Sequence, residues 1–518
     1  MSRAERSDGK HWRGWWAACL AGLAVWLTGG AWADEAVEFE RWYVMRLDGE
    51  RVGHAVSRQN TVIGQDGSEQ IVSEQDVVMS FRRGAMALTI EQSSRAVETP
   101  EGEPIEVEQR LLLGQLPQSA RYTFDDAGAV MVSEQGGRRT ERRVPGLPEG
   151  ALMPAAAQRK IAAALAEGAE SIELTTADYS SGLRAVDVTM TVAGEEDVEV
   201  LGKVVPAIAW DATASAMPGA KLREYVDAEG RPLKSTVDLG GMRLEMIAAE
   251  EAIATAAVDP PELMASTLIT PSRPIDRPRE LRRAVYELVW DRPMRGQVEL
   301  VETAVQRVEW VDDRTARVTV DIMAPVMSKL DAADREEHLA ASTMIDRDDP
   351  AVLALTRRGS PEDTTPRQLT NLLGVARNAI RQTDLSVGFA TASEVARSRQ
   401  GDCTEHAVLL AALSRAEGYP SRVVTGLIYA DEFLGQRGVF GYHMWTQSWV
   451  DADEGSPEGR WVDLDATLPA GFSGTGFDAT HIALTASPLS DADGFNDLAE
   501  LSTLIGGMSI RVVETGDE

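Results

Sequence analysis

The chain has 518 residues, 82 acidic against 51 basic side chains, and a formal net charge of −31 at pH 7. A surface this acidic repels phosphate backbones and anionic lipid headgroups, which argues against nucleic acid or an anionic membrane as a partner. At roughly 150 residues per domain, the length predicts about three domains with sizeable cores.

Residues 1–33 have the order of a cleaved export signal. Basic residues from Arg3 to Arg13 precede an apolar run from Trp15 to Leu27, and the small-x-small sequence Ala31-Trp32-Ala33 follows. The apolar run is shorter than the ~20 residues that span hydrocarbon, so an uncleaved anchor is the weaker alternative. We expect cleavage after Ala33, export to the periplasm or the exterior, and no stable membrane insertion of the mature product.

Residues 34–255 are predicted to form a mostly antiparallel β domain. Alternating apolar runs end there in hairpin signals such as Asp48-Gly49 and Asp126-Ala127-Gly128. An alanine-rich stretch from Ala155 to Glu167, followed by Gly168, predicts one short helix. This half contains no evident set of reactive side chains.

A proline-rich linker is predicted at 256–280, because its prolines disfavour both helix and central strand. Residues 281–345 alternate as strands and predict a small β domain or an extension of a neighbouring sheet. A helix is expected from Arg367 to Arg381. Residues 346–518 are predicted to form the last domain.

The chain contains two cysteines, of which Cys19 falls within the expected signal, so the mature chain keeps only Cys403. Asp402 and Glu405 have the spacing of a capping box, and the apolar run that follows ends at Gly418. Cys403 is therefore expected in the first turn of a buried helix, where the helix dipole favours a thiolate. The charge of Asp402 opposes that effect, so a basic partner is required.

Two downstream runs are expected to supply this partner. Alternation places His443, Trp445 and Gln447 on one face of a strand, and Asp463 and Asp465 on one face of the next. The turn-rich segment between them predicts an antiparallel hairpin in which facing residue numbers sum to about 911, which sets His443 nearer Asp465 than Asp463. A thiol, an imidazole and an orienting carboxylate form the reactive set of cysteine acyl transfer.

Residues about 365–485 resemble the transglutaminase-like superfamily. The resemblance is carried by Arg399-Gln400-Gly401-Asp402-Cys403-Thr404-Glu405-His406-Ala407, by Gly418-Tyr419-Pro420-Ser421-Arg422-Val423-Val424-Thr425-Gly426, by His443-Met444-Trp445, and by Trp461-Val462-Asp463-Leu464-Asp465-Ala466-Thr467. Matched position by position, the superfamily's cysteine, histidine and aspartate correspond to Cys403, His443 and Asp465. Ala466 replaces the proline that is common in the superfamily.

The resemblance implies an α+β fold class, with residues 346–518 as a transglutaminase-like catalytic domain. Its papain-like α+β core would attack a protein or peptide amide through a thioester, which an amine or water then resolves. Peptide of the cell wall is one substrate of this kind. Gln400 is a candidate oxyanion donor beside the Cys403 amide, and His406 and Trp445 are candidate neighbours that support the reactive side chains. No cofactor is expected.

Two alternatives remain open. Cys403, His406 and His443 could bind zinc, although a structural zinc site usually needs four ligands. The domain could also serve as a non-catalytic binding scaffold, although a scaffold would not need to retain all three reactive residues. His481 has no assigned task.

Overall fold

The computed structural model describes residues 38–516 except for short gaps. These gaps are 84–85, 114–115, 136–137, 180–182, 216–219, 229, 239–242, 263–266, 297, 357–364, 383–389, 454, 470, 472 and 491–506. The expected export signal lies outside the described residues. Two compact units are present, one ending at Glu262 and the other comprising the described residues from 267 onward. Each unit is described by itself.

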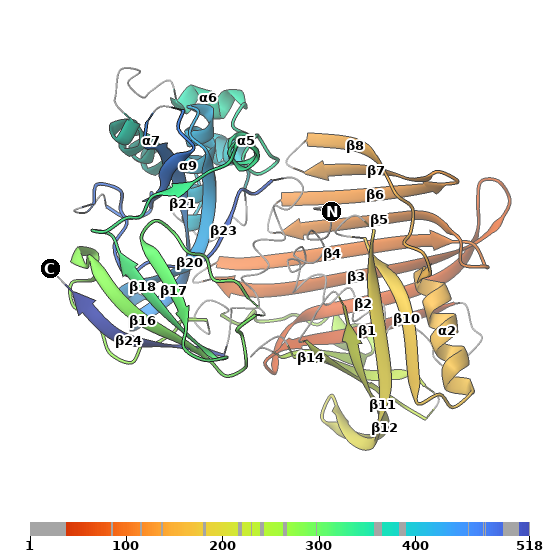
Figure 1. Ribbon diagram of the computed structural model, residues 1–518. Helices are drawn as coiled ribbons and strands as arrows, with labels where there is room; N and C mark the ends of the chain where they lie inside the picture. The colour runs from red at the N-terminus through yellow and green to blue at the C-terminus, as the bar shows by residue number, and fades with distance from the viewer. Residues whose placement is uncertain are drawn as a thin grey trace, which may run out of the picture. The chain divides into compact units, whose positions relative to one another are not determined.

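The N-terminal unit is built on one 15-stranded sheet (Figure 1). Its strand order is β8-β7-β6-β5-β4-β3-β2-β1-β15-β14-β13-β12-β11-β10-β9, and its pairs are antiparallel except β9 with β10. The strands are β1 (Phe39–Leu47), β2 (Glu50–Ile63), β3 (Glu69–Arg83), β4 (Met86–Glu98), β5 (Pro104–Leu113), β6 (Leu116–Asp125), β7 (Gly128–Gln135), β8 (Arg138–Val144), β9 (Ala151–Leu152), β10 (Ser171–Asp178), β11 (Arg184–Val200), β12 (Lys203–Ala214), β13 (Lys221–Val226), β14 (Pro232–Asp238) and β15 (Arg243–Ala249). The predicted antiparallel N-terminal region is confirmed.

Helix α2 (Pro154–Ala166) agrees closely with the predicted helix, and α3 (Glu251–Ala254) follows the last strand. The amides of Ala155 and Ala156 both donate to the buried carboxylate of Glu98 in β4, at 2.9 Å each. These two bonds satisfy helix N-terminal donors and fix α2 to the sheet. At the other end of the sheet, β8 pairs only with β7 among the described strands.

The C-terminal unit contains two further sheets. One is four-stranded in the order β17-β18-β16-β24, and the other is five-stranded in the order β19-β22-β21-β20-β23. The strands are β16 (Arg283–Trp290), β17 (Gln306–Trp310), β18 (Thr315–Asp321), β19 (Ser328–Lys329), β20 (Ser421–Phe433), β21 (Gln436–Asp451), β22 (Glu458–Leu464), β23 (Ile482–Ser487) and β24 (Met508–Gly516). The helices are the 3-10 turn η1 (Pro278–Glu280), α5 (Ala332–Leu339), α6 (Pro350–Thr356), α7 (Thr365–Ala379), α8 (Ala392–Ser398) and α9 (Cys403–Ala416).

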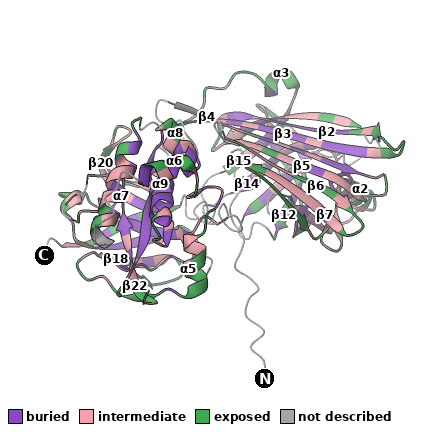
Figure 2. Ribbon diagram, turned by 90° about the horizontal axis from the view of Figure 1, so that it is seen from above, coloured by how far each residue is buried: buried purple, intermediate pink, exposed green. Residues whose placement is uncertain are grey.

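One hydrophobic core joins the two sheets of this unit. Tyr286 and Val318 from the four-stranded sheet pack in the same cluster as Val424, Trp445 and Ile482 from the five-stranded sheet. Helix α9 packs on β21, where Thr446 Oγ1 donates to the Ala407 carbonyl at 2.9 Å. The helix is largely buried, as its colour in Figure 2 shows. The start of α9 is therefore held at the strands that carry the candidate site.

As a whole the chain is mostly β, so the predicted α+β class describes it only in part. The long N-terminal sheet outweighs the helices, which are confined mainly to the C-terminal unit. Among the described residues, no helix combines the length and the apolar character needed to span a bilayer.

Candidate active site

The predicted nucleophile lies at the first position of α9. Asp402 caps the helix, with its Oδ1 accepting from the Thr404 amide at 2.9 Å, and Glu405 Oε2 accepts from the Asp402 amide at 2.9 Å. This capping box confirms the predicted start of the helix. Cys403 is partly exposed, while the helix residues that follow it are buried. Cys403 thus combines a helix N-terminus with partial exposure of the residue.

Gly401 is required by the geometry just before the nucleophile. Its φ is +150°, and a Cβ built there would lie 2.3 Å from the Glu405 Cβ. Glu405 itself is fully buried, and burial followed by the charge of Asp402 raises the pKa of its carboxyl to about 8. Any larger residue at position 401 would displace the capping box and with it the thiol.

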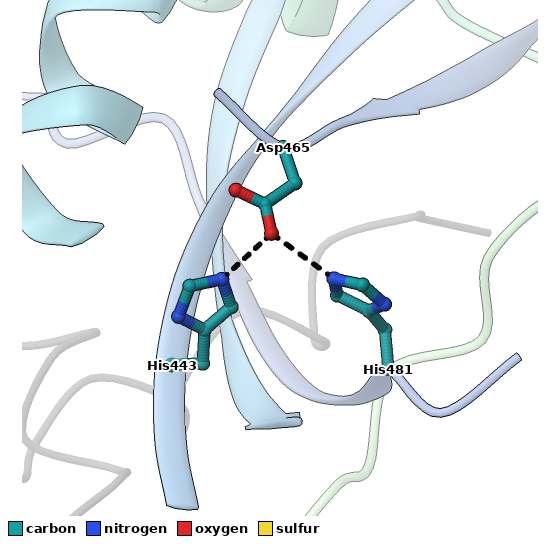
Figure 3. Close-up of side chains that lie close together, drawn as sticks. All are labelled: His443, Asp465 and His481. Carbon is teal, nitrogen blue, oxygen red and sulfur yellow. Dashed lines mark hydrogen bonds and ion pairs between the residues drawn. The ribbon is translucent and has the colours of Figure 1, made fainter. Parts of the chain in front are cut away.

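The predicted base and its orienting carboxylate are in contact. His443 in β21 places Nε2 at 2.9 Å from Oδ2 of Asp465, as Figure 3 shows. Because Nε2 faces the carboxylate, Nδ1 is the nitrogen left for the thiol. A hydrogen bond with Cys403 is among the contacts that raise the pKa of His443. His443 thus contacts Asp465 directly, and Cys403 is a further neighbour that acts on its pKa.

Asp465 reaches this position because it lies just beyond the end of β22. The hairpin pairs Thr446 with Leu464 and Trp449 with Trp461, so facing numbers sum to 910, one less than expected. Its carboxylate is fixed from both sides, since Oδ1 accepts from the amide and the hydroxyl of Thr467 at 2.8 and 2.6 Å.

A second histidine, to which the sequence assigns no task, completes the surroundings of Asp465. Nε2 of His481 lies 3.2 Å from the same Oδ2 that accepts from His443 (Figure 3). His481 is completely buried just before β23, which pairs with β20. In the sequence, His481 follows Asp478-Ala479-Thr480, and no local pattern links this histidine to Asp465.

Burial disfavours the charged form of both histidines, but their bonds to Asp465 outweigh it. The charge and hydrogen bond of Asp465, with the bond to Cys403, raise the pKa of His443 to about 9. Hydrogen bonds to Asp465 and Asp478 raise the pKa of His481 to about 9. For Asp465, burial acts in the opposite direction, yet the two histidines hold its pKa well below the usual range. The contacts with Asp465 therefore favour the protonated form of both rings.

The other candidate residues also lie near this site, with different partners. Trp445 is buried, stacks on His443 with ring centroids 6.2 Å apart, and donates from Nε1 to Asp463 at 2.8 Å. His406 is buried with Nδ1 2.7 Å from the Asp402 carbonyl oxygen, and burial lowers its pKa. Gln400 precedes the nucleophile, and its Nε2 donates to Gln382 Oε1 at 2.5 Å.

Strands β20 and β23 approach each other closely at Gly426 in β20. A Cβ built there would lie 2.1 Å from the Ile482 carbonyl oxygen and 2.8 Å from Cη2 of Trp445. Only glycine at position 426 leaves room for both the Ile482 carbonyl and the Trp445 ring.

His443, Asp465 and His481 also have the composition of a metal-binding site, because their ligand atoms lie within 4.8 Å of one another. In the structure, however, both Nε2 atoms face one carboxylate oxygen at hydrogen-bond distance. This geometry matches two N–H donors sharing one acceptor.

The arrangement resembles the nucleophile, base and orienter sets used in covalent catalysis. A comparison with family descriptions matches residues 354–466 to the "Transglutaminase-like superfamily". The comparison with curated proteins gave no match.

Two solved structures are distantly similar. A β-barrel-like protein with a domain of unknown function, DUF1849, from Brucella abortus is 13% identical with a TM-score of 0.31, over 41% of this chain and 96% of that one. A protein from Cytophaga hutchinsonii described as a "putative cysteine protease" is 13% identical with a TM-score of 0.27, over 44% of this chain and 83% of that one. The assignment depends on the family match, by which the C-terminal unit carries a domain of the transglutaminase-like superfamily.

Proposed function

We propose that the protein is an exported cysteine-dependent acyl-transfer enzyme that attacks protein or peptide amides from a papain-like α+β core. The observation that carries the proposal is the contact series from Cys403 to His443 to Asp465, with the thiol partly exposed and its two partners buried. The superfamily match supports the chemical class. A scaffold without catalysis would have no need for a partly exposed thiol beside a protonated imidazole.

In the first half of the reaction, the Cys403 thiolate attacks the carbonyl carbon of the amide, and a carbon–sulfur bond forms. Negative charge moves to the carbonyl oxygen. The amide of Cys403 can stabilise this oxygen, because the first amides of a helix have no intrahelical partner. His443 then gives the proton on Nδ1 to the leaving nitrogen as the carbon–nitrogen bond breaks, which releases an amine and leaves a thioester.

In the second half, His443 accepts a proton at Nδ1 from water or from an acceptor amine. The activated oxygen or nitrogen attacks the thioester carbonyl, and the carbon–sulfur bond breaks to restore the thiolate. Asp465 holds the Nε2–H of His443 throughout, which maintains the tautomer and stabilises the imidazolium. Hydrolysis and amine transfer use the same residues and differ only in which nucleophile reaches the thioester.

Alkylation of Cys403 tests the nucleophile without a known substrate. The full chain is treated with iodoacetamide at pH 7, and the adduct is mapped to the tryptic peptide spanning residues 400–415, which separates it from Cys19. We expect alkylation at least about tenfold faster than that of free cysteine, because a thiolate is the reactive form. The matched variant His443→Gln should lose this advantage.

Turnover is then tested with a protein mixture and a fluorescent primary amine. Incorporation of the amine indicates transfer, and release of new amino groups without such incorporation indicates hydrolysis, with Cys403→Ala as the control in both. A thiol no more reactive than free cysteine, in a folded protein, contradicts the enzymatic proposal and favours the scaffold.

A further inference from the structure

We propose that His481 is a positioning residue of the active site, which clamps Asp465 opposite His443 and, as a fixed cation, limits how tightly His443 holds its proton. This inference rests on the proposed function. It extends the reactive set from three residues to a line of six, from the thiol of Cys403 to the guanidinium of Arg279.

The line is continuous in the structure. Beyond the contact of His481 with Asp465, Nδ1 of His481 lies 3.1 Å from the Asp478 carbonyl oxygen, 3.3 Å from the Asp478 amide nitrogen and 3.5 Å from Asp478 Oδ1. Oδ2 of Asp478 is paired with Arg279 in η1 at 2.8 Å. Acidic and basic groups alternate along the line, in the order Cys403, His443, Asp465, His481, Asp478 and Arg279.

The ring of His481 is fixed by its packing. It stacks on Phe477 with centroids 4.4 Å apart and meets Trp445 edge to face at 5.3 Å. The segment before it is fixed too, because the Ala479 amide donates to the Leu281 carbonyl at 2.9 Å, and Tyr286 donates to the Ala479 carbonyl at 2.9 Å. The imidazole has no room to turn away from Asp465.

The charged and titratable groups around His481 come from several elements. They are Asp465 and Asp463 at the end of the β22 hairpin strand, His443 in β21, Asp478 in the preceding loop, Arg279 in η1 and Tyr286 in β16. The two carboxylates in direct contact, Asp465 and Asp478, favour the imidazolium form of His481. Arg279 pairs with Asp478 and holds it in place without contacting Asp465.

The clamp has a chemical consequence for His443. A carboxylate shared with one histidine alone would hold the proton of that histidine tightly and make it a poor acid toward the leaving amine. The cation of His481 lies with its ring centroid 5.9 Å from that of His443. A like charge at this distance disfavours the protonated form of His443 and so lowers its pKa. A lower pKa lets His443 give up its proton and take it back more readily during catalysis.

The experiment compares His481→Gln and His481→Phe in the full chain, with His54→Gln in the N-terminal unit as the matched control. The alkylation rate of Cys403 is measured from pH 5 to pH 10.5, together with the ring nitrogen NMR titration of His443. Glutamine keeps a neutral N–H donor toward Asp465 but removes the cation. Phenylalanine keeps the stack on Phe477 but removes both donor and cation.

We expect the upper pH transition, at which His443 loses its proton, to move up by about one pH unit in both variants. The alkylation rate at pH 7 should fall at least about tenfold in His481→Phe and less than threefold in His481→Gln, since only phenylalanine releases the clamp. His54→Gln should match the wild type. Thermal melts establish that each variant is folded, and the nearly isosteric His481→Gln serves if His481→Phe is not.

A transition unchanged from wild type in folded His481→Gln overturns the inference while leaving the proposed function intact. Loss of wild-type reactivity on treatment with a chelator also overturns it, because that result makes His443, Asp465 and His481 metal ligands. A wild-type thiol without enhanced reactivity defeats the proposed function itself. The outcomes are therefore distinguishable.

Discussion

Asp465 lies one residue beyond the last residue of β22, and its Oδ2 is 2.9 Å from Nε2 of His443 in the neighbouring strand. The ladder between β21 and β22 ends at the pair Thr446 and Leu464. Because the chain leaves the sheet there, the carboxylate is free to turn toward the histidine, and Thr467 fixes it in that direction. The contact between His443 and Asp465 thus depends on β22 ending at Leu464.

Replacing Asp465 by asparagine should abolish most of the reactivity. Two imidazole donors would then face an amide, one of whose atoms is itself a donor, so the tautomer and orientation of His443 would be lost. We expect amide turnover to fall by about 10²- to 10⁴-fold. Steady-state turnover and Cys403 alkylation measure the effect, with Thr467→Ser, which keeps the hydroxyl, as the control. An Asp465→Asn variant with wild-type turnover would remove the carboxylate from the mechanism.

Stability should fall as the pH rises through the range in which the two histidines titrate. Both have a folded pKa of about 9 against an ordinary histidine value of 6.5, so each contributes stability that is complete below about pH 6.5 and is lost as the pH rises through about 9. Each histidine that is protonated in the folded protein but neutral in the unfolded chain lowers the unfolding free energy by about 1.4 kcal/mol per pH unit. Glu405, with its pKa raised to about 8, adds a loss of the same sign at lower pH.

Urea unfolding between pH 6 and pH 9.5 measures this slope. The folded His481→Gln variant should show a shallower slope than the wild type, because one of the two histidines is gone. An unfolding free energy that is constant across this range would contradict the ionisation states assigned to the site.

A methyl group at position 426 should destabilise the C-terminal unit. In Gly426→Ala the new Cβ would meet the Ile482 carbonyl oxygen and Trp445, neither of which has space to move. We expect a loss of about 2–4 kcal/mol in unfolding free energy. The matched control is Gly374→Ala in α7, where no atom lies within 4 Å of the new Cβ and alanine should stabilise by about 0.5–1 kcal/mol. Equal melting temperatures for the two variants would disprove the close approach.

The part played by Gln400 can be separated from that of the thiol. Acylation by p-nitrophenyl acetate passes through an oxyanion, whereas alkylation by iodoacetamide does not. If Gln400 stabilises the oxyanion, Gln400→Ala should slow the acylation burst by about 10- to 100-fold and leave alkylation within about twofold. Its present bond to Gln382 predicts that Gln382→Ala frees the amide and leaves the burst at least as fast as in wild type. Parallel losses of both reactions in Gln400→Ala would instead indicate a purely structural effect.

Local sequence signals predicted the start of α9 and the hairpin of β21 and β22 well. The capping residues Asp402 and Glu405 fix a helix end by short-range hydrogen bonds, which sequence spacing reveals directly. The hairpin register, expected at a sum of about 911, is 910 in the structure, and the bond from the Ala452 amide to the Glu458 carbonyl continues the same register into the loop. Such a difference depends on turn geometry, which composition does not encode.

The contribution of His481 could not be predicted in the same way. It reaches Asp465 because β23 pairs with β20 on the side opposite to β21. This is a crossover between strands distant in sequence, and the periodicity around residue 481 carries no information about it. The long N-terminal sheet was predictable in type from its alternation, whereas the order of its strands was not.

The outer strand β8 has a consequence for how the chains behave at high concentration. Arg139, Arg142 and Arg143 are exposed along this strand, which has a neighbour on one side only among the described strands. An unpaired strand is a template for self-assembly, since its free amides and carbonyls can accept a second molecule. Two such edges would bring exposed charged side chains together, and burying these charges is expected to disfavour edge-to-edge assembly.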